Sequence, residues 1–159
     1  MGIDLDDVLI TRSKESNIFP NEVTFQRLDI MEENAPSQLL MYLHTHKRNE
    51  FDIISCFSTT MWIHLNYGDE GLENFIKYIS DITKYLLLEP QEWKCYKSAA
   101  RRLTRLNHKV FEIKKLKVKN ITEFLKSFLE NQCNMKLQTC FGETSWGRKL
   151  YLFSKKDIS

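Results

Sequence analysis

The sequence lacks several features that would place a protein in a broad class at once. Its 159 residues contain no apolar run of about 18 residues, so we expect no transmembrane helix and no membrane partner. The N-terminal segment MGIDLDDVLI is acidic and has no basic region, which argues against a signal peptide. With only 5 glycines and 3 prolines, no flexible linker divides the chain. We therefore expect one globular domain over residues 1–159.

Cysteine is also too sparse to indicate a disulfide framework. The four cysteines form no C-x-x-C pair, so we expect reduced thiols and a cytoplasmic or nuclear protein. His44 and His46 form an H-x-H pair, but no cysteine or carboxylate is spaced to complete a metal site. We expect no bound metal.

Positive charge is scarce in the first half and abundant in the second. Residues 1–80 contain 6 Lys+Arg and 13 Asp+Glu, whereas residues 81–159 contain 17 and 8. A basic half suggests a polyanionic partner such as nucleic acid. The alternative, which is commoner in a generic chain, is a solvated helix face.

Apolar patterning predicts strands and helices that alternate over most of the chain. The predicted strands cover 2–5, 23–28, 51–57, 85–88, 135–141 and 149–153, and the predicted helices cover 6–17, 38–45, 68–82, 92–106 and 121–132. This order indicates an α/β fold with a parallel sheet, helices on both faces, and an antiparallel C-terminal strand pair at its edge. The apolar strand over 51–57 is expected to be covered on both faces.

The segment STTMWIHLNYGDEG, residues 58–71, is interpreted as a polar and aromatic loop after the strand over 51–57. Ligands of open α/β sheets bind at the carboxyl ends of the strands. The segment therefore predicts a binding site, presented by Ser58, Thr59, Thr60, Trp62, His64 and Asn66.

Two acidic segments allow several interpretations. The segment GIDLDD could supply a strand-end carboxylate for a ribose diol, a phosphatase nucleophile with carboxylates for Mg²⁺, or a helix N-cap from Asp6 or Asp7. Asp29 ends a predicted strand, where a carboxylate can accept a hydrogen bond from an adenine amino group; an exposed turn aspartate is the simpler alternative.

Aromatic side chains accompany the arginines of the basic helix. Such rings can stack on bases while arginines meet phosphates, and core or rim packing is the alternative. The side chains concerned are Trp62, Trp93, Tyr96 and Trp146, with Arg101, Arg102 and Arg105.

Three longer segments carry a family resemblance. MWIHLNYGDEGL, YLLLEPQEWKCYKSAARRL and FGETSWGRKLYLF resemble the bicoid-interacting-protein-three type of S-adenosylmethionine methyltransferase, and GIDLDDVLI is similar to its second-strand motif. The resemblance extends from Gly2 to about Phe153. It implies a Rossmann-like class I methyltransferase sheet and S-adenosyl-L-methionine as cofactor.

Met61 and the segments WKCYKSAARRL and CFGETSW distinguish the two branches of this family. One branch caps 5′-triphosphate ends of small nuclear RNA, and the other methylates 5′-monophosphates of transfer RNA and microRNA precursors. Met61 stands where the capping enzymes carry a lysine. The resemblance therefore implies a monomeric, cytoplasmic RNA 5′-monophosphate methyltransferase, with 5′-triphosphate capping as the more remote alternative.

The resemblance also implies site residues. Asp4 and Leu5 correspond to the cofactor ribose contacts, Asp29 and Ile30 to the adenine contacts, and Phe57 to the position beside the methionine part. The residues expected at the RNA 5′ end are His64 and Asn66, in a catalytic role, and Met61, Trp62, Trp93, Tyr96, Arg101 and Arg102. We hypothesise that these groups position the phosphate, with His64 as a phosphate ligand.

One part of the family pattern has no counterpart in the sequence. The first strand and its glycine-rich loop, which hold the cofactor's methionine end, are missing before Gly2. We therefore expect an incomplete domain with unpaired strand edges, marginal folding and weak cofactor binding. The alternatives are a catalytically inactive RNA- or partner-binding fragment and, more remotely, a phosphatase.

Overall fold

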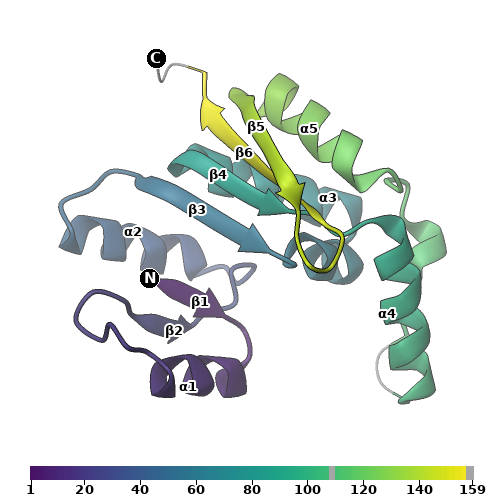
Figure 1. The fold of residues 1–159 in the computed structure, drawn as a ribbon, viewed down its shortest axis with the longest axis horizontal. Coiled ribbons are helices and arrows are strands. Elements are labelled where there is room, and N and C mark those ends of the chain that lie inside the picture. Colours follow the sequence, from purple (N-terminus) through teal and green to yellow (C-terminus); the bar gives the residue numbers. More distant parts are fainter. Residues whose placement is uncertain (108–109, 157–159) are drawn as a thin grey trace. The chain divides into compact units, whose positions relative to one another are not determined.

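The computed structural model describes residues 1–107 and 110–156, which divide into two compact units (Figure 1). The first unit, Met1–Asn49, contains β1 (Gly2–Asp4), α1 (Asp7–Glu15), β2 (Phe25–Arg27) and α2 (Ala35–Thr45). β1 and β2 pair in parallel as a two-stranded sheet. Asp6 caps α1, because its Oδ1 accepts hydrogen bonds from the backbone N–H of Val8 (2.8 Å) and of Leu9 (3.4 Å). The cap interpretation of Asp6 is thus confirmed.

The second unit begins at Glu50 and contains a four-stranded sheet. Its elements are β3 (Phe51–Phe57), α3 (Thr60–Asp81), β4 (Thr83–Glu89), α4 (Trp93–Arg105), the 3-10 turn η1 (Ile113–Lys115), α5 (Ile121–Gln132), β5 (Met135–Glu143) and β6 (Lys149–Lys155). The strand order is β3-β4-β6-β5, with β3 parallel to β4 and β6 antiparallel to both of its neighbours. The antiparallel C-terminal pair is confirmed on one side of the sheet, where β5 is the edge strand and β6 pairs with β4.

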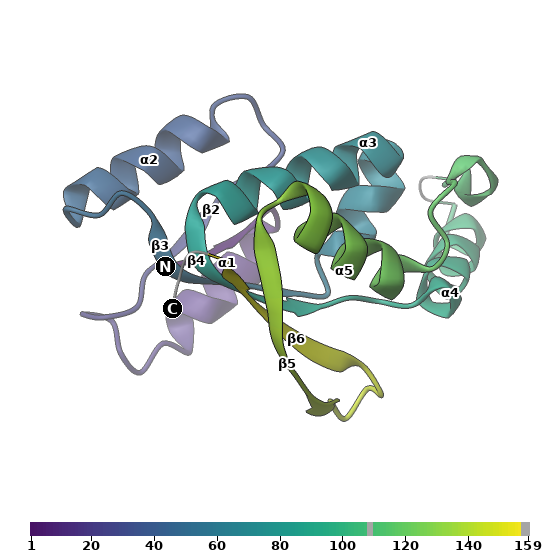
Figure 2. The same cartoon turned by 90° about the horizontal axis from the view of Figure 1, so that it is seen from above.

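Helices α3 and α5 lie on the same face of this sheet (Figure 2). Their apolar faces meet β4, β5 and β6 in the core of the unit. Burial of each large apolar side chain stabilises the fold by about 1.5–3 kcal/mol. The side chains that are almost wholly buried include Leu72, Ile76, Leu86, Leu88, Leu125, Leu129, Met135 and Phe153. None of the helices within residues 1–107 and 110–156 is both long and apolar enough to span a membrane.

The strand predicted to be covered on both faces is partly exposed. β3 has the predicted bounds, but it forms one edge of the four-stranded sheet, and its side chains alternate between the faces. Cys56 is buried, whereas Ile53 and Phe57 on the opposite face are 54% and 53% exposed. The prediction of coverage on both faces was wrong for β3, because a continuous apolar run does not show which neighbours a strand has.

The predicted loop over 58–71 is mostly helix. Only Ser58 and Thr59 precede α3, which begins at Thr60 instead of near Gly68. Met61, His64 and Leu65 are buried at helical spacing, and the helix is kinked at Gly68 (φ 74°, ψ −171°). The polar side chains that suggested a loop are therefore distributed over a helix.

Candidate functional site at the ends of β3 and β4

A polar cluster joins the carboxyl ends of β3 and β4 to the β5–β6 hairpin. Ser58 follows β3 in the left-handed backbone region (φ 57°), and its hydroxyl donates to Glu89 Oε2 at 3.0 Å. Arg148 Nη1 donates to Ser58 Oγ and lies 3.5 Å from Glu89 Oε1. The Glu89 side chain is only 8% exposed, so this arginine neutralises an almost buried carboxylate. The cluster fixes the direction of the Arg148 side chain at the strand ends.

Beside this cluster lies a cavity of about 580 Å³, here called the α3 hollow. Three of the predicted RNA-contact residues, Met61, Trp62 and Arg102, line it. The other lining residues are Ser58, Gln91, Lys94, Cys95, Ser98, Ala99 and Arg148. The structure therefore gathers three cationic side chains around a site that the sequence placed at the carboxyl end of β3.

Gln91, which lines the α3 hollow, has a buried side-chain oxygen without a hydrogen-bond partner among the described residues. The residue is 2% exposed, and its Nε2 donates to the Ser58 carbonyl at 3.1 Å. Its Oε1 is buried and has no hydrogen-bond partner among the described residues. Buried polar atoms are normally satisfied, so this oxygen is suited to accept a hydrogen bond from a water or a bound molecule.

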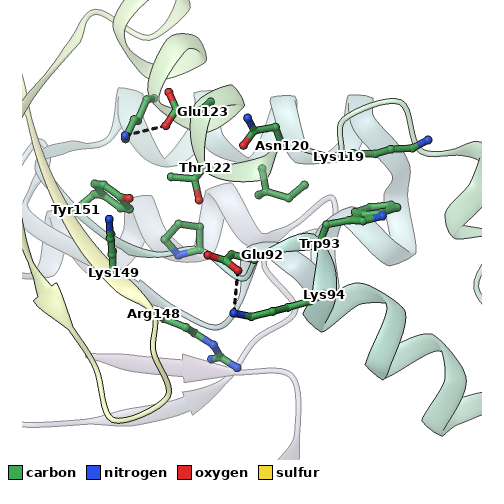
Figure 3. Close-up of a pocket in the computed structure, with 13 residues that line it drawn as sticks. Glu92, Trp93, Lys94, Lys119, Asn120, Thr122, Glu123, Arg148, Lys149 and Tyr151 are labelled. Atoms are coloured by element: carbon green, nitrogen blue, oxygen red, sulfur yellow. Dashed lines mark hydrogen bonds and ion pairs between the residues drawn. The ribbon is translucent and has the colours of Figure 1, made fainter.

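A second cavity, here called the α5 hollow, has a volume of about 630 Å³ (Figure 3). It is lined by the start of α4, the start of α5 and the start of β6. Lys94 and Arg148 line both hollows. Of the predicted site residues, Trp93 lies here.

The structure places the His64 side chain in the interior of the second unit. The residue is 0% exposed, its Nε2 lies 2.9 Å from Asp69 Oδ1, and its Nδ1 lies 3.1 Å from the Tyr96 hydroxyl. Tyr96 is also 0% exposed and stacks on Trp93, with ring centroids 5.1 Å apart. Burial and internal hydrogen bonds occupy both side chains, and the roles predicted for His64 and Tyr96 at the RNA 5′ end remain predictions.

Asn66, Arg101 and Phe57 stay outside both hollows. The Asn66 amide donates to the Trp62 carbonyl one turn earlier, at 2.8 Å. Arg101 Nε likewise donates to the Lys97 carbonyl of its own helix, at 3.2 Å. Phe57 is half-exposed at the end of β3. Their predicted roles remain predictions.

The predicted cofactor carboxylates both lie at the carboxyl end of the β1–β2 sheet. Asp4 ends β1, and Asp29 follows Leu28 after the end of β2. Asp4 Oδ1 accepts from the Asp6 N–H at 2.8 Å, and Asp29 Oδ1 accepts from the Met31 N–H at 2.9 Å. Each Oδ2 has no hydrogen bond to another described residue, so both carboxylates fit the task of accepting bonds from ribose hydroxyls or an adenine amine. Leu5 is exposed and Ile30 is half-buried beside them.

Solved structures share this fold. The 2.2 Å crystal structure of WbdD matches with a TM-score of 0.54 at 16% identity, covering 97% of this chain and 30% of that one. A structure described as the bifunctional kinase-methyltransferase WbdD matches with a TM-score of 0.55 at 18% identity, covering 97% of this chain and 29% of that one. These matches show that the chain has an α/β fold that also occurs in part of WbdD.

The chain belongs to the Bicoid-interacting protein 3 (Bin3) family, whose model matches residues 51–155. It is 43% identical to an RNA 5′-monophosphate methyltransferase of Rattus norvegicus over 96% of this chain and 55% of that protein. It is 41% identical to a pre-miRNA 5′-monophosphate methyltransferase of Danio rerio, over 98% of this chain and 63% of that protein. A 7SK snRNA methylphosphate capping enzyme of Mus musculus is 32% identical over 89% of this chain and 21% of that protein.

These comparisons confirm the family resemblance and the greater similarity to its monophosphate branch. The chain spans about half the length of the curated relatives, between 53% and 63% for the 5′-monophosphate methyltransferases. The phosphatase interpretation of GIDLDD is not supported, since the family is one of methyltransferases and Asp6 serves as a helix cap.

The sequence did not indicate that Ser58 contacts Glu89 and Arg148. It also did not indicate that Lys94, Gln91 and Arg148 line the α3 hollow. Arg148 lies in FGETSWGRKLYLF, one of the segments that carried the family resemblance. Its approach to Glu89, however, depends on β6 pairing with β4. No local pattern in the sequence indicates that pairing.

Proposed function

We propose that this chain carries the acceptor side of an RNA 5′-phosphate methyltransferase, which transfers a methyl group from S-adenosyl-L-methionine to the 5′-monophosphate of an RNA. The observation that carries the proposal is the α3 hollow, where Lys94, Arg102 and Arg148 surround a cavity at the carboxyl ends of β3 and β4. Three cations suit a dianionic phosphate. The curated names of the monophosphate methyltransferases support the same substrate class.

The transfer requires little acid–base catalysis. The second pKa of a phosphate monoester is about 6, so its oxygen is already anionic at pH 7. S-adenosyl-L-methionine supplies an electrophilic methyl carbon when it is bound. An oxygen–carbon bond forms as the carbon–sulfur bond breaks, the electron pair remains on sulfur, and no proton moves. The protein must therefore align the phosphate oxygen within about 3–3.5 Å of that carbon and exclude water.

Arg148 is the residue best suited to that alignment. Its guanidinium is oriented by Ser58 and Glu89, so little side-chain freedom is lost when an oxyanion binds. Lys94 is held less firmly, since the ion pair that it forms within the described part of the chain, with Glu92 at 3.0 Å, is solvent-exposed. Met61 and Trp62 supply an apolar wall that limits water in the α3 hollow.

The cofactor would be held by residues of the first unit. We propose that Asp4 accepts hydrogen bonds from the ribose hydroxyls and that Asp29 accepts one from the adenine amine. The support is that both carboxylates lie at the carboxyl end of parallel strands and each has one oxygen in a backbone hydrogen bond. Leu5 and Ile30 would then flank the nucleoside.

The test measures two properties of the chain on the same RNAs: methyl transfer and equilibrium binding. The RNAs are matched oligonucleotides that carry a 5′-monophosphate, a 5′-hydroxyl or a 5′-triphosphate. We expect methylation and the tightest binding with the monophosphate. Arg148→Ala is expected to weaken both by about ten- to a hundredfold, because it removes a charge-assisted hydrogen bond.

Arg105→Ala serves as the matched control, since Arg105 is exposed on α4 and lines neither hollow. Binding that favours the monophosphate without methyl transfer would identify the RNA-binding fragment instead of the enzyme. Equal binding of the hydroxyl and monophosphate RNAs would contradict the proposal.

A further inference from the structure

The α5 hollow is a second basic cavity, and most of the residues that line it have no part in the proposed transfer reaction. Five basic side chains line it, against two carboxylates. Glu92 pairs with Lys94 at 3.0 Å, and Glu123 pairs with Lys126 at 3.0 Å. The basic side chains are Lys94, Lys119, Lys126, Arg148 and Lys149. The excess charge of the cavity is therefore positive.

Lys119 and Lys149 provide charge that no internal partner neutralises. Both side chains are exposed, and neither forms an ion pair with another residue of the described part of the chain. Figure 3 shows Lys119 beyond Trp93 on the α5 side and Lys149 on the β6 side. Cations on opposite sides of one cavity can contact successive phosphates of an extended strand.

Two helices begin at the same cavity. The N-cap residues of α4 and α5 are Glu92 and Asn120, and neither side chain accepts a hydrogen bond from its helix. The positive ends of both helix dipoles therefore add to the lysine charge.

Aromatic and amide groups make the cavity suitable for nucleotides and not only for inorganic anions. Trp93 is held by its stacking on the buried Tyr96, with ring centroids 5.1 Å apart. Tyr151 also lines the wall, with Lys126 Nζ 5.0 Å from its ring centroid. Asn120 and Thr122 add polar groups that can meet base edges or ribose hydroxyls. Tyr151 is 6% exposed, so Trp93, which is only partly buried, is the ring on which a base can stack, as in single-strand binding sites.

The α5 hollow shares two lining residues with the α3 hollow. Lys94 and Arg148 line both cavities, so a strand whose first phosphate lies in the α3 hollow can enter the α5 hollow beside the same two cations. We propose that the α5 hollow binds the nucleotides that follow the 5′-terminal one in a single-stranded RNA end. This inference rests on the proposed function, in which the α3 hollow holds the 5′-phosphate.

The experiment compares RNA binding by the 159-residue chain and by two double variants. The test variant is Lys119→Ala/Lys149→Ala, and the control is Lys77→Ala/Lys136→Ala, which removes the same charge from exposed positions that line neither hollow. Affinity for a 5′-phosphorylated eight-nucleotide single-stranded RNA is measured by fluorescence anisotropy over a range of salt concentrations. A 5′-phosphorylated mononucleotide is then used as a competitor for each protein.

We expect the test variant to bind the oligonucleotide about tenfold more weakly than the control does. The slope of log affinity against log salt concentration should be smaller in magnitude by roughly 1 to 1.5, which corresponds to two lost phosphate contacts on a single strand. Competition by the mononucleotide should be unchanged, because it reaches only the α3 hollow. Equal affinities and equal slopes for the two double variants would overturn the inference. It would also be overturned if the test variant lost as much affinity for the mononucleotide as for the oligonucleotide, or if the unmodified chain did not bind the oligonucleotide.

The two proposals can fail separately. Suppose that the unmodified chain binds 5′-hydroxyl and 5′-phosphorylated RNA equally well, and that the test variant loses the same affinity for both. The strand site in the α5 hollow would then be supported and the proposed function would be contradicted. If the chain kept its preference for the 5′-phosphate while Lys119→Ala/Lys149→Ala had no effect, only the strand site would fall.

Discussion

Buried polar side chains, rather than exposed ones, hold the helices around the α3 hollow in position. His64 links α3 to α4 through Tyr96 and to the segment before α5 through Asp69. A neutral imidazole with its proton on Nε2 satisfies both contacts, donating to Asp69 and accepting from the Tyr96 hydroxyl. Burial raises the pKa of Tyr96, so its phenol remains a donor. We infer that His64 holds α4, and thereby Lys94 and Arg102, in place.

Asp69 provides a test of this network through pH. Burial raises the pKa of Asp69, but hydrogen bonds from the Lys117 and Val118 N–H groups and from His64 outweigh burial and hold the pKa below the usual 3.8. Its stabilising effect is therefore complete above about pH 4 and is lost as the pH falls through the folded-state pKa. Asp69→Ala should lower the free energy of unfolding by about 2–4 kcal/mol at pH 7.

Urea unfolding at pH 7 and at pH 3 measures this effect. The difference between the unmodified chain and Asp69→Ala should shrink at the lower pH. Asp52→Ala is the control, because Asp52 pairs with Lys84 in an exposed salt bridge that should contribute less than about 1 kcal/mol. A loss from Asp69→Ala that did not depend on pH would contradict the role of the ionised carboxylate.

Arg148 and Glu89 form a second coupled pair. Arg148→Ala leaves the Glu89 carboxylate almost buried without its cation, so we expect unfolding to become easier by about 2–3 kcal/mol. Arg148→Ala/Glu89→Gln should recover part of that loss, since a neutral amide is less costly to bury. Thermal or urea unfolding of both single variants and the double variant checks the coupling. Additive single effects would show that the two groups do not interact.

At the scale of elements, the bounds of strands and helices could be predicted from the sequence more accurately than their burial and their neighbours. The predicted bounds of β3 and α5 are those of the structure. The helix over 60–67 was missed because Thr60 and His64 occupy its buried face, where local patterning expects apolar residues. His64 is acceptable there only because Asp69 and Tyr96 satisfy it, and those contacts arise from tertiary structure.

In the candidate site, too, only the residues that depend on local sequence could be predicted. Met61, Trp62 and Arg102 were predicted as RNA contacts, and they do line one cavity. Met61 and Trp62 follow β3 closely in sequence, so a rule about strand ends could find them. Arg148 lies 90 residues after Ser58, and its place in the cluster requires the β4–β6 pairing.

The kink in α3 depends on one glycine. Gly68 has φ 74° and ψ −171°, a conformation that is essentially restricted to glycine, although a Cβ atom would meet no atom within 4 Å. Gly68→Ala should therefore destabilise the fold by about 1–3 kcal/mol through backbone strain alone. Gly142→Ala is the control, because Gly142 also has open space but has no positive φ. Thermal unfolding of both variants makes the comparison, and equal melting temperatures would contradict a strained kink.

At the scale of the whole molecule, the two units divide the proposed tasks. The first unit contains the carboxylates proposed to hold the cofactor, Asp4 and Asp29, and the second contains both hollows and the basic helix α4. The charge is uneven between the units as well, since residues 1–49 contain 5 Lys+Arg and 8 Asp+Glu, whereas residues 50–159 contain 18 and 13.

The division into units predicts where the chain is first cut by a protease. Lys47 and Arg48 are exposed next to the boundary at Asn49, and Lys47 has a left-handed backbone (φ 54°) in the turn after α2. Exposed connections between compact units are preferred cleavage sites, because local opening there disturbs little packing. Limited trypsin digestion should therefore cut early after Lys47 or Arg48, as read by mass spectrometry, and the fragment that begins there should keep β3 and β4 protected. Lys47→Gln/Arg48→Gln should remove this cleavage, because trypsin cuts only after lysine and arginine. Early cuts within β3 or β4, with the 47–48 bonds intact, would mean that the second unit does not hold its own core.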